Sequence, residues 1–303
     1  MKFKVIVTLV TILILGGLFS VGYLVFFNQK PDHTFALKQW EQTLVNPVSS
    51  AVLKGKQYLE ETRDPYPANT NTYDVSALPD ATVLEVIPGL PVDDNPQGQI
   101  TNLVVSAKES PAPIFASPLD NQPLARLPLE HVHGGVSVPV IEQYQNWVRV
   151  LLAGRAGLPS QGISGQLTGW VRVSDINFIQ NDTRVELSIS ARTITVVSPN
   201  GNEVIATDFG WGKEATPTPM GRTFIMLTEV VPQFTYTQGH PIVYLGIQST
   251  TLDEFSGTPA AITAFHYHGI RSGAISNGCV RVDAQGITKL SALPAGTAVI
   301  LAP

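Results

Sequence analysis

The chain has 303 residues, 44% of them hydrophobic, and a formal net charge of -5 at pH 7. A chain of this length accommodates two modest domains with cores of their own. No basic stripe runs along the sequence, which argues against nucleic acid as a partner because phosphate contacts require clustered positive charge. Cys279 is the only cysteine, so an intramolecular disulfide is excluded.

The N-terminal segment is predicted to cross a membrane once. Lys2 and Lys4 precede an uncharged stretch from Val5 to Phe27, which is long enough to span a bilayer as a helix. We therefore expect residues 1–30 to be a cytoplasmic tip and transmembrane signal anchor, with the rest of the chain on the extracytoplasmic, cell-wall side. A cleaved signal peptide is the alternative, and it would export the same body.

Two segments are expected to connect this anchor to the folded body. In residues 31–63, leucine and tryptophan recur with helical spacing, which predicts a helical stalk. Residues 64–101 are rich in proline, asparagine, threonine, aspartate and glycine, and this composition breaks any periodicity. The second segment is therefore predicted to be a linker with one short strand near residues 82–87.

Short apolar runs separated by turn residues predict a small β-barrel over residues 102–177. Two of these runs, Trp147 to Val150 and Gly169 to Val171, resemble the "W-x-x-V" and "G-W-V" strands of bacterial SH3-type domains. The resemblance implies a wall-targeting or spacer module. An all-β spacer without a ligand is the alternative.

A second β-rich region follows this barrel. Asn200-Gly201 lies between two alternating apolar runs and is a strong signal for a hairpin. Farther along, His266 and His268 are two positions apart on an expected strand, so their side chains face the same way. Cys279 is expected to begin the next strand.

Cys279 is the candidate nucleophile. A neighbouring histidine can favour the reactive thiolate, and His268 lies only eleven residues upstream. The amides of Gly278 and Cys279 can donate to a developing oxyanion, and the fork of Arg281 can bind a carboxylate. The plainer interpretation is a buried core cysteine, structural histidines and an ion pair between Arg281 and Asp283. A metal site is not expected, because "HYH" lacks further ligands nearby.

Residues 183–303 resemble the L,D-transpeptidases with a YkuD-type catalytic domain. The resemblance rests on motifs that occur in the family's order, namely a strand pair like "VELSISARTITVV", the loop "TPTPMG" at 216–221, His268-Gly269, and "SNGCVR" at 276–281. It implies a β-sandwich with a short helix before the final strand. The expected fold class is thus mostly β, with an N-terminal transmembrane helix, an SH3-type barrel and this sandwich.

The resemblance also implies acyl transfer on peptidoglycan stem peptides, without a metal or cofactor. Cys279 would attack the carbonyl of the third stem residue, expel the terminal D-alanine and form a thioester that an acceptor amine converts into a cross-link. The implied catalytic residues are Cys279, His268, Gly278 and Ser276. Those expected beside the substrate are Arg281, Tyr244, His266 and Asn277, with His266 as the alternative base.

Other classes of protein share parts of this pattern. Water in place of the acceptor amine would make the protein an L,D-carboxypeptidase, and a degenerate catalytic domain would make it a non-catalytic wall-binding scaffold. A sortase would carry its histidine far upstream of a "T-L-x-T-C" segment, which this sequence lacks. A papain-like peptidase would need a histidine after Cys279, and none follows.

Overall fold

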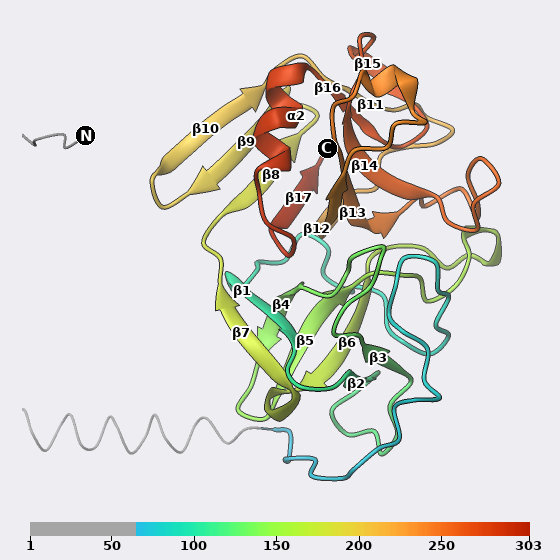
Figure 1. Cartoon of the computed structure of the whole chain (residues 1–303), viewed down its shortest axis with the longest axis vertical. Helices are drawn as coiled ribbons and strands as arrows, with labels where there is room; N and C mark the ends of the chain where they lie inside the picture. The colour runs from blue at the N-terminus through green and yellow to red at the C-terminus, as the bar shows by residue number, and fades with distance from the viewer. Residues whose placement is uncertain (1–64) are drawn as a thin grey trace, which may run out of the picture. The chain divides into compact units, whose positions relative to one another are not determined.

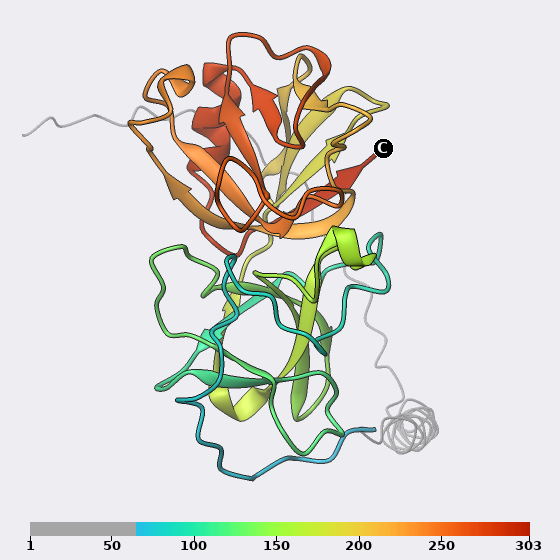
Figure 2. The same cartoon turned by 90° about the vertical axis from the view of Figure 1, so that its right-hand side faces the viewer.

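The computed structural model describes residues 65–303, which lie in one compact unit, so the predicted anchor (1–30) and stalk (31–63) fall outside the described residues. The described part is mostly β and contains a single short α-helix. Within it, no helix combines the length and the hydropathy needed to cross a membrane. Its strands make up two sheets, which remain distinct in both views (Figure 1 and Figure 2).

The N-terminal sheet has seven strands in the order β3-β2-β6-β5-β4-β1-β7, and all neighbours are antiparallel. Its strands are β1 (Leu103–Ala107), β2 (Ala112–Phe115), β3 (Ala125–Leu127), β4 (Val138–Gln143), β5 (Trp147–Leu152), β6 (Leu167–Arg172) and β7 (Ile176–Gln180). The sequence predicts a closed barrel here, whereas β3 and β7 end an open order, so the sheet is a half-barrel. An SH3-type identity for it stays a prediction.

The segment before β1 is packed against this sheet, although the sequence predicts a linker. Its buried residues Ala81, Val83, Ile87 and Leu90 share the core of the N-terminal sheet. The expected strand at 82–87 is absent, and isolated bridges at Asp80, Val86 and Val92 attach the segment instead. Proline and glycine prevent a regular ladder, but the apolar side chains between them still gain free energy from burial.

The C-terminal sheet has ten strands in the order β10-β9-β8-β17-β12-β13-β14-β16-β11-β15. They are β8 (Arg184–Ser188), β9 (Thr193–Ser198), β10 (Gly201–Ala206), β11 (Gly210–Gly212), β12 (Gly221–Glu229), β13 (Ile242–Gln248), β14 (Ile262–Tyr267), β15 (Gly273–Ser276), β16 (Val280–Val282) and β17 (Ala298–Ala302). The hairpin predicted at Asn200-Gly201 is confirmed by the antiparallel pairing of β9 and β10.

The long strand β12 makes this sheet continuous, whereas the family resemblance implies a β-sandwich. The first half of β12 pairs with β17, and the second half pairs with β13. The helix α2 (Ala284–Ser291) lies against the sheet and buries Ile287 and Leu290 in its core (Figure 1). Asp283 caps this helix by accepting a hydrogen bond of 2.7 Å from the Gly286 amide.

A buried ion pair ties the segment before β1 to the C-terminal sheet. Arg222 on β12 donates to both carboxylate oxygens of Asp93, at 2.8 and 2.9 Å. The two side chains are only 4% and 1% exposed, and Arg222 Nη1 also donates to the Gln99 carbonyl at 2.6 Å. Such a bidentate pair fixes geometry as well as charge.

Replacing Asp93 with asparagine should lower the free energy of unfolding by about 3–5 kcal/mol, because it leaves the Arg222 guanidinium buried without a counter-charge. Urea unfolding measures this loss. The matched control is Asp80→Asn, which breaks the half-exposed pair with Arg126 (side chains 29% and 24% exposed) and should cost only about 0–1 kcal/mol. Equal losses in the two variants would contradict the role given to the buried pair.

Candidate active site

Cys279 lies in the short turn between β15 and β16. Gly278 precedes it with a φ of 115°, a conformation that glycine adopts with little strain. The Ser276 hydroxyl accepts a hydrogen bond from the Gly278 amide at 3.1 Å and donates to the Cys279 carbonyl at 2.5 Å. Ser276 therefore stabilises the turn. The Gly278 amide, which was expected to bind an oxyanion, donates to the Ser276 hydroxyl in this structure.

Two threonines of the loop before β12 secure the same turn. Thr218 Oγ1 accepts from the Gly212 amide and donates to the Gly278 carbonyl, both at 2.9 Å. Thr216 Oγ1 donates to the Ser276 carbonyl at 3.3 Å. A Cβ on Gly212 would lie 2.3 Å from the Thr216 carbonyl oxygen, so the loop packs closely on this strand. The "TPTPMG" motif indicates this loop, but no pattern in the sequence predicts the hydrogen bonds of its threonines.

The pairing of β14 with β16 places the cysteine relative to the histidines. The strands are parallel, with Phe265 opposite Val280 and His266 opposite Arg281. Continuing this register by one residue places Cys279 opposite Ala264. Alternation puts Cys279, His266 and Arg281 on one face of the sheet. His266 is then a diagonal neighbour of the cysteine, at a typical separation of about 7–8 Å, and His268 lies two residues farther along.

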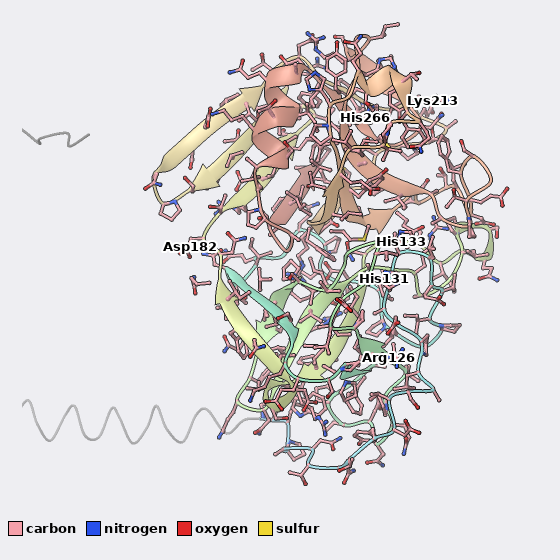
Figure 3. The ribbon with its side chains drawn as sticks, in the orientation of Figure 1. Arg126, His131, His133, Asp182, Lys213 and His266 are labelled. Carbon is pink, nitrogen blue, oxygen red and sulfur yellow. The ribbon has the colours of Figure 1, made fainter. Side chains whose placement is uncertain are left out.

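This face of the sheet opens into a cavity of about 520 Å³. Of the residues predicted from the sequence as a site, the cavity wall includes Cys279, His266, His268, Arg281, Tyr244, Ser276 and Asn277. No aspartate or glutamate is among the described residues that line it. His131 and His133, which no motif connects to this site, lie apart from His266 (Figure 3). The structure therefore gathers the predicted residues at one place.

His266 is buried and neutral. Burial lowers its pKa to about 4, and the nearby charges of Arg281 and His268 act in the same direction. Its Nδ1 lies 2.9 Å from the Tyr267 carbonyl oxygen. Since a carbonyl only accepts, Nδ1 carries the proton of the neutral ring, and Nε2 is left with a free lone pair.

His268 has the opposite arrangement. Its Nδ1 accepts a hydrogen bond of 2.9 Å from the Ile270 amide, so the proton of the neutral ring is on Nε2. Partial burial and then the charge of Arg281 lower its pKa. A neutral His268 thus has no free basic nitrogen while this bond is made.

The thiol of Cys279 is also neutral at rest. Burial raises its pKa, against smaller opposing effects of the Ala264 amide and the Arg281 charge. Sγ lies 3.7 Å from the Ile262 carbonyl oxygen. The site therefore holds a thiol and an imidazole in their uncharged forms, and a preformed thiolate–imidazolium pair is disfavoured.

Arg281 is available to bind an anion. Its Nη1 donates to the Ile270 carbonyl at 3.3 Å, and its Nε is buried without a hydrogen-bond partner. The ion pair with Asp283 considered from the sequence is not among those of the described residues, because Asp283 caps α2 instead. A substrate carboxylate would satisfy the buried Nε.

Two tyrosines complete the wall of the cavity. Tyr236, in the turn η3 (Thr235–Thr237), packs its ring 5.2 Å from that of His266 and 5.8 Å from that of His268, measured between centroids. Burial, with a further effect of Glu229, raises the pKa of Tyr244 to about 12. Tyr244 was predicted, whereas no motif in the sequence pointed to Tyr236.

The depressed pKa of His266 should make folding stability depend on pH. An unfolded chain protonates this ring near its ordinary pKa of 6.5, but the folded chain does so only near 4. The free energy of unfolding should therefore fall as the pH drops from about 6.5 to about 4. Urea unfolding across this range, with an NMR titration of the ring, measures the effect.

The controls for this pH dependence are two single variants. His266→Phe should flatten the dependence, because it removes the group whose pKa differs between the two states. His133→Gln, at an exposed histidine, should leave it unchanged. A titration midpoint of His266 near 6.5 would contradict the environment described for it.

Comparison with known proteins gives one family match and several similar solved structures. Residues 182–301 match the YkuD family model, described as the L,D-transpeptidase catalytic domain. No curated protein sequence matches the chain. The similar solved structures include an L,D-transpeptidase from Mycobacterium smegmatis, with 13% identity, a TM-score of 0.31, and coverage of 52% of this chain and 91% of that one.

Two further solved structures have similar sequence identities and TM-scores. Mycobacterium tuberculosis L,D-transpeptidase 1 has 16% identity, a TM-score of 0.27, and coverage of 45% of this chain and 78% of that one. The catalytic domain of the E. faecium L,D-transpeptidase has 19% identity, a TM-score of 0.26, and coverage of 39% and 95%. On the family match, residues 182–301 are a YkuD-type L,D-transpeptidase catalytic domain.

Proposed function

We propose that this domain cross-links peptidoglycan stem peptides with Cys279 as its nucleophile and His266 as its base. The observation that carries the proposal is the shared face of β14 and β16, which brings a thiol, a basic imidazole nitrogen and an arginine to one cavity. The family match supports the reaction class. No metal or cofactor enters the proposed steps.

In the first step, Sγ of Cys279 attacks the carbonyl carbon of the third stem residue while Nε2 of His266 takes the thiol proton. The tetrahedral intermediate then collapses. Its C–N bond to D-alanine breaks, and the imidazolium of His266 returns the proton to the leaving amine. The product is a thioester on Cys279 and free D-alanine.

In the second step, an acceptor amine attacks the thioester carbonyl. Nε2 of His266 takes a proton from this amine, and the C–S bond breaks as the new amide forms. The imidazolium of His266 then returns this proton to Sγ, which restores the thiol. Water in place of the amine would release a free carboxylate, which is the carboxypeptidase outcome. The first step begins from the neutral resting forms of both side chains, and the second step restores them.

The choice of His266 differs from the sequence prediction, which assigned the base to His268. Two observations favour the change. His266 is the nearer diagonal neighbour of Cys279 in the strand register, and its Nε2 has a free lone pair. The Nδ1 of His268 is already bonded to the Ile270 amide, so we assign this residue to substrate contact.

The remaining residues position the substrate or the turn. We assign Arg281 to a stem carboxylate, Tyr244 and Asn277 to the cavity wall, and Ser276 to holding the Cys279 turn. The Gly278 amide would serve the oxyanion once the substrate carbonyl replaces the Ser276 hydroxyl as its acceptor.

We also propose a place for the chain in the cell. The uncharged N-terminal stretch supports a single-pass signal anchor in the cell membrane, with the catalytic domain on the cell-wall side. The strand motifs at Trp147 and Gly169 support a wall-targeting SH3-type module. Both proposals rest on the sequence.

The full chain incubated with a disaccharide tetrapeptide should form a thioester on Cys279, because the thiol is the proposed nucleophile. Intact-protein mass spectrometry should detect the adduct, and product analysis should show D-alanine with cross-linked dimer. Cys279→Ala should form neither. An adduct-free wild type that behaves like Cys279→Ala would favour the wall-binding scaffold, and D-alanine release without any dimer would favour the carboxypeptidase.

Replacing the two histidines singly should identify the base. His266→Gln should slow acylation by about 10²–10⁴-fold, because it removes the proton acceptor. His268→Gln, the matched control one residue beyond the end of β14, should slow acylation by less than about tenfold. Single-turnover acylation measures both rates, and a greater loss in the His268 variant would return the role of base to His268.

A further inference from the structure

One wall of the cavity is a loop that receives support from outside the catalytic sheet. The loop comprises residues 249–261, between β13 and β14, and Ser249, Phe255, Ser256 and Thr258 line the cavity from it. Phe255 is 45% exposed. Within the loop, the Ser249 amide bonds to the Ala261 carbonyl at 2.8 Å and closes the loop at its base. At the tip, only an isolated antiparallel bridge joins Phe255 to Thr258.

The support comes from Arg155, which follows β5 of the N-terminal sheet. Its Nη1 donates to the Asp253 carbonyl at 2.6 Å, and its Nη2 donates to the Leu252 carbonyl at 2.7 Å and the Ser249 carbonyl at 3.4 Å. The side chain is buried, with the whole residue 5% exposed. One guanidinium thus binds three backbone carbonyls of the loop.

The backbone of Arg155 is fixed in turn. Its amide donates to the Glu85 carbonyl at 3.0 Å, and its carbonyl accepts from the Ile87 amide at 2.7 Å. A neighbouring contact adds to the support, since the Ser160 amide donates to Asp253 Oδ1 at 3.0 Å. The loop is therefore bound by residues between β5 and β6 of the N-terminal sheet, and the backbone of Arg155 is itself fixed by hydrogen bonds.

The hydrogen-bond partners of Arg155 indicate that it positions the backbone of the loop and does not pair with a carboxylate. No carboxylate forms an ion pair with it among the described residues, so its partners are neutral carbonyls. Only arginine offers a planar fork of donors that can reach several carbonyls at once. A lysine at the same position would keep the charge but could satisfy fewer of them.

We propose that Arg155 is a positioning residue for the substrate cavity. Through Arg155, the N-terminal sheet and the segment packed against it form a structural part of the site. Arg155 touches neither Cys279 nor His266. Its loss should therefore change how the substrate is held more than how fast the bound substrate reacts. The kinetic part of this inference rests on the proposed transpeptidase function, whereas the structural part does not.

The test compares Arg155→Met and Arg155→Lys with the wild type in the full chain. The matched control is Arg126→Met, which removes an arginine of the N-terminal sheet that bonds to Asp80 and the Val75 carbonyl. Arg126 lies well away from His266 in the view with side chains (Figure 3). Hydrogen exchange of residues 249–261 measures how firmly the loop is held, without any need for activity.

Amides of the loop should exchange at least about tenfold faster in Arg155→Met than in the wild type or Arg126→Met, with an intermediate value in Arg155→Lys. Alkylation of Cys279 by iodoacetamide should become severalfold faster in the same order, because the cavity wall loosens. With the tetrapeptide donor, KM should rise about five- to tenfold while kcat stays within about twofold.

Unchanged exchange in residues 249–261 would overturn the inference. Faster exchange with unchanged alkylation would also overturn it, because the loop would then not shape the cavity. A wild type without transpeptidase activity would refute the proposed function alone, since exchange and alkylation still decide the role of Arg155. If Arg155→Met lacks a cooperative unfolding transition, Arg155→Lys carries the same comparisons.

Discussion

The site depends on the parallel pairing of β14 with β16. This pairing sets His266 opposite Arg281 and brings Cys279 beside Ala264, so that a single sheet face presents all the reactive groups. Parallel neighbours cannot be joined by a tight turn, and the chain uses the intervening residues to add β15 at the sheet edge. The Cys279 turn is then fixed by Ser276 from within and by Thr218 from the adjoining loop.

The electrostatics of the cavity follow from this arrangement. Burial disfavours protonation of His266, and the nearby positive charge of Arg281 adds to this effect. No carboxylate lines the wall among the described residues to oppose it. Burial keeps the Cys279 thiol protonated as well. Proton transfer between them is thus expected during attack on the substrate, with the buried Arg281 Nε ready to bind a carboxylate.

Local patterns predicted the parts of the structure that depend on neighbours in sequence. The Asn200-Gly201 hairpin follows from turn chemistry, and the common face of His266 and His268 follows from strand alternation. The choice between these histidines could not be predicted, because it depends on strand register and on which carbonyl or amide each Nδ1 meets. The contacts of Arg155 with the cavity loop join residues almost a hundred positions apart, and no sequence period encodes them.

The pH dependence of single-turnover acylation tests most directly whether Cys279 and His266 act as a neutral pair. Because the pKa of His266 is about 4 and that of Cys279 is raised, the acylation rate should be nearly constant from about pH 5.5 to about pH 8. The same plateau should persist in His268→Gln. A rate that instead rises with a midpoint near 6.5, and loses this rise in His268→Gln, would contradict the account.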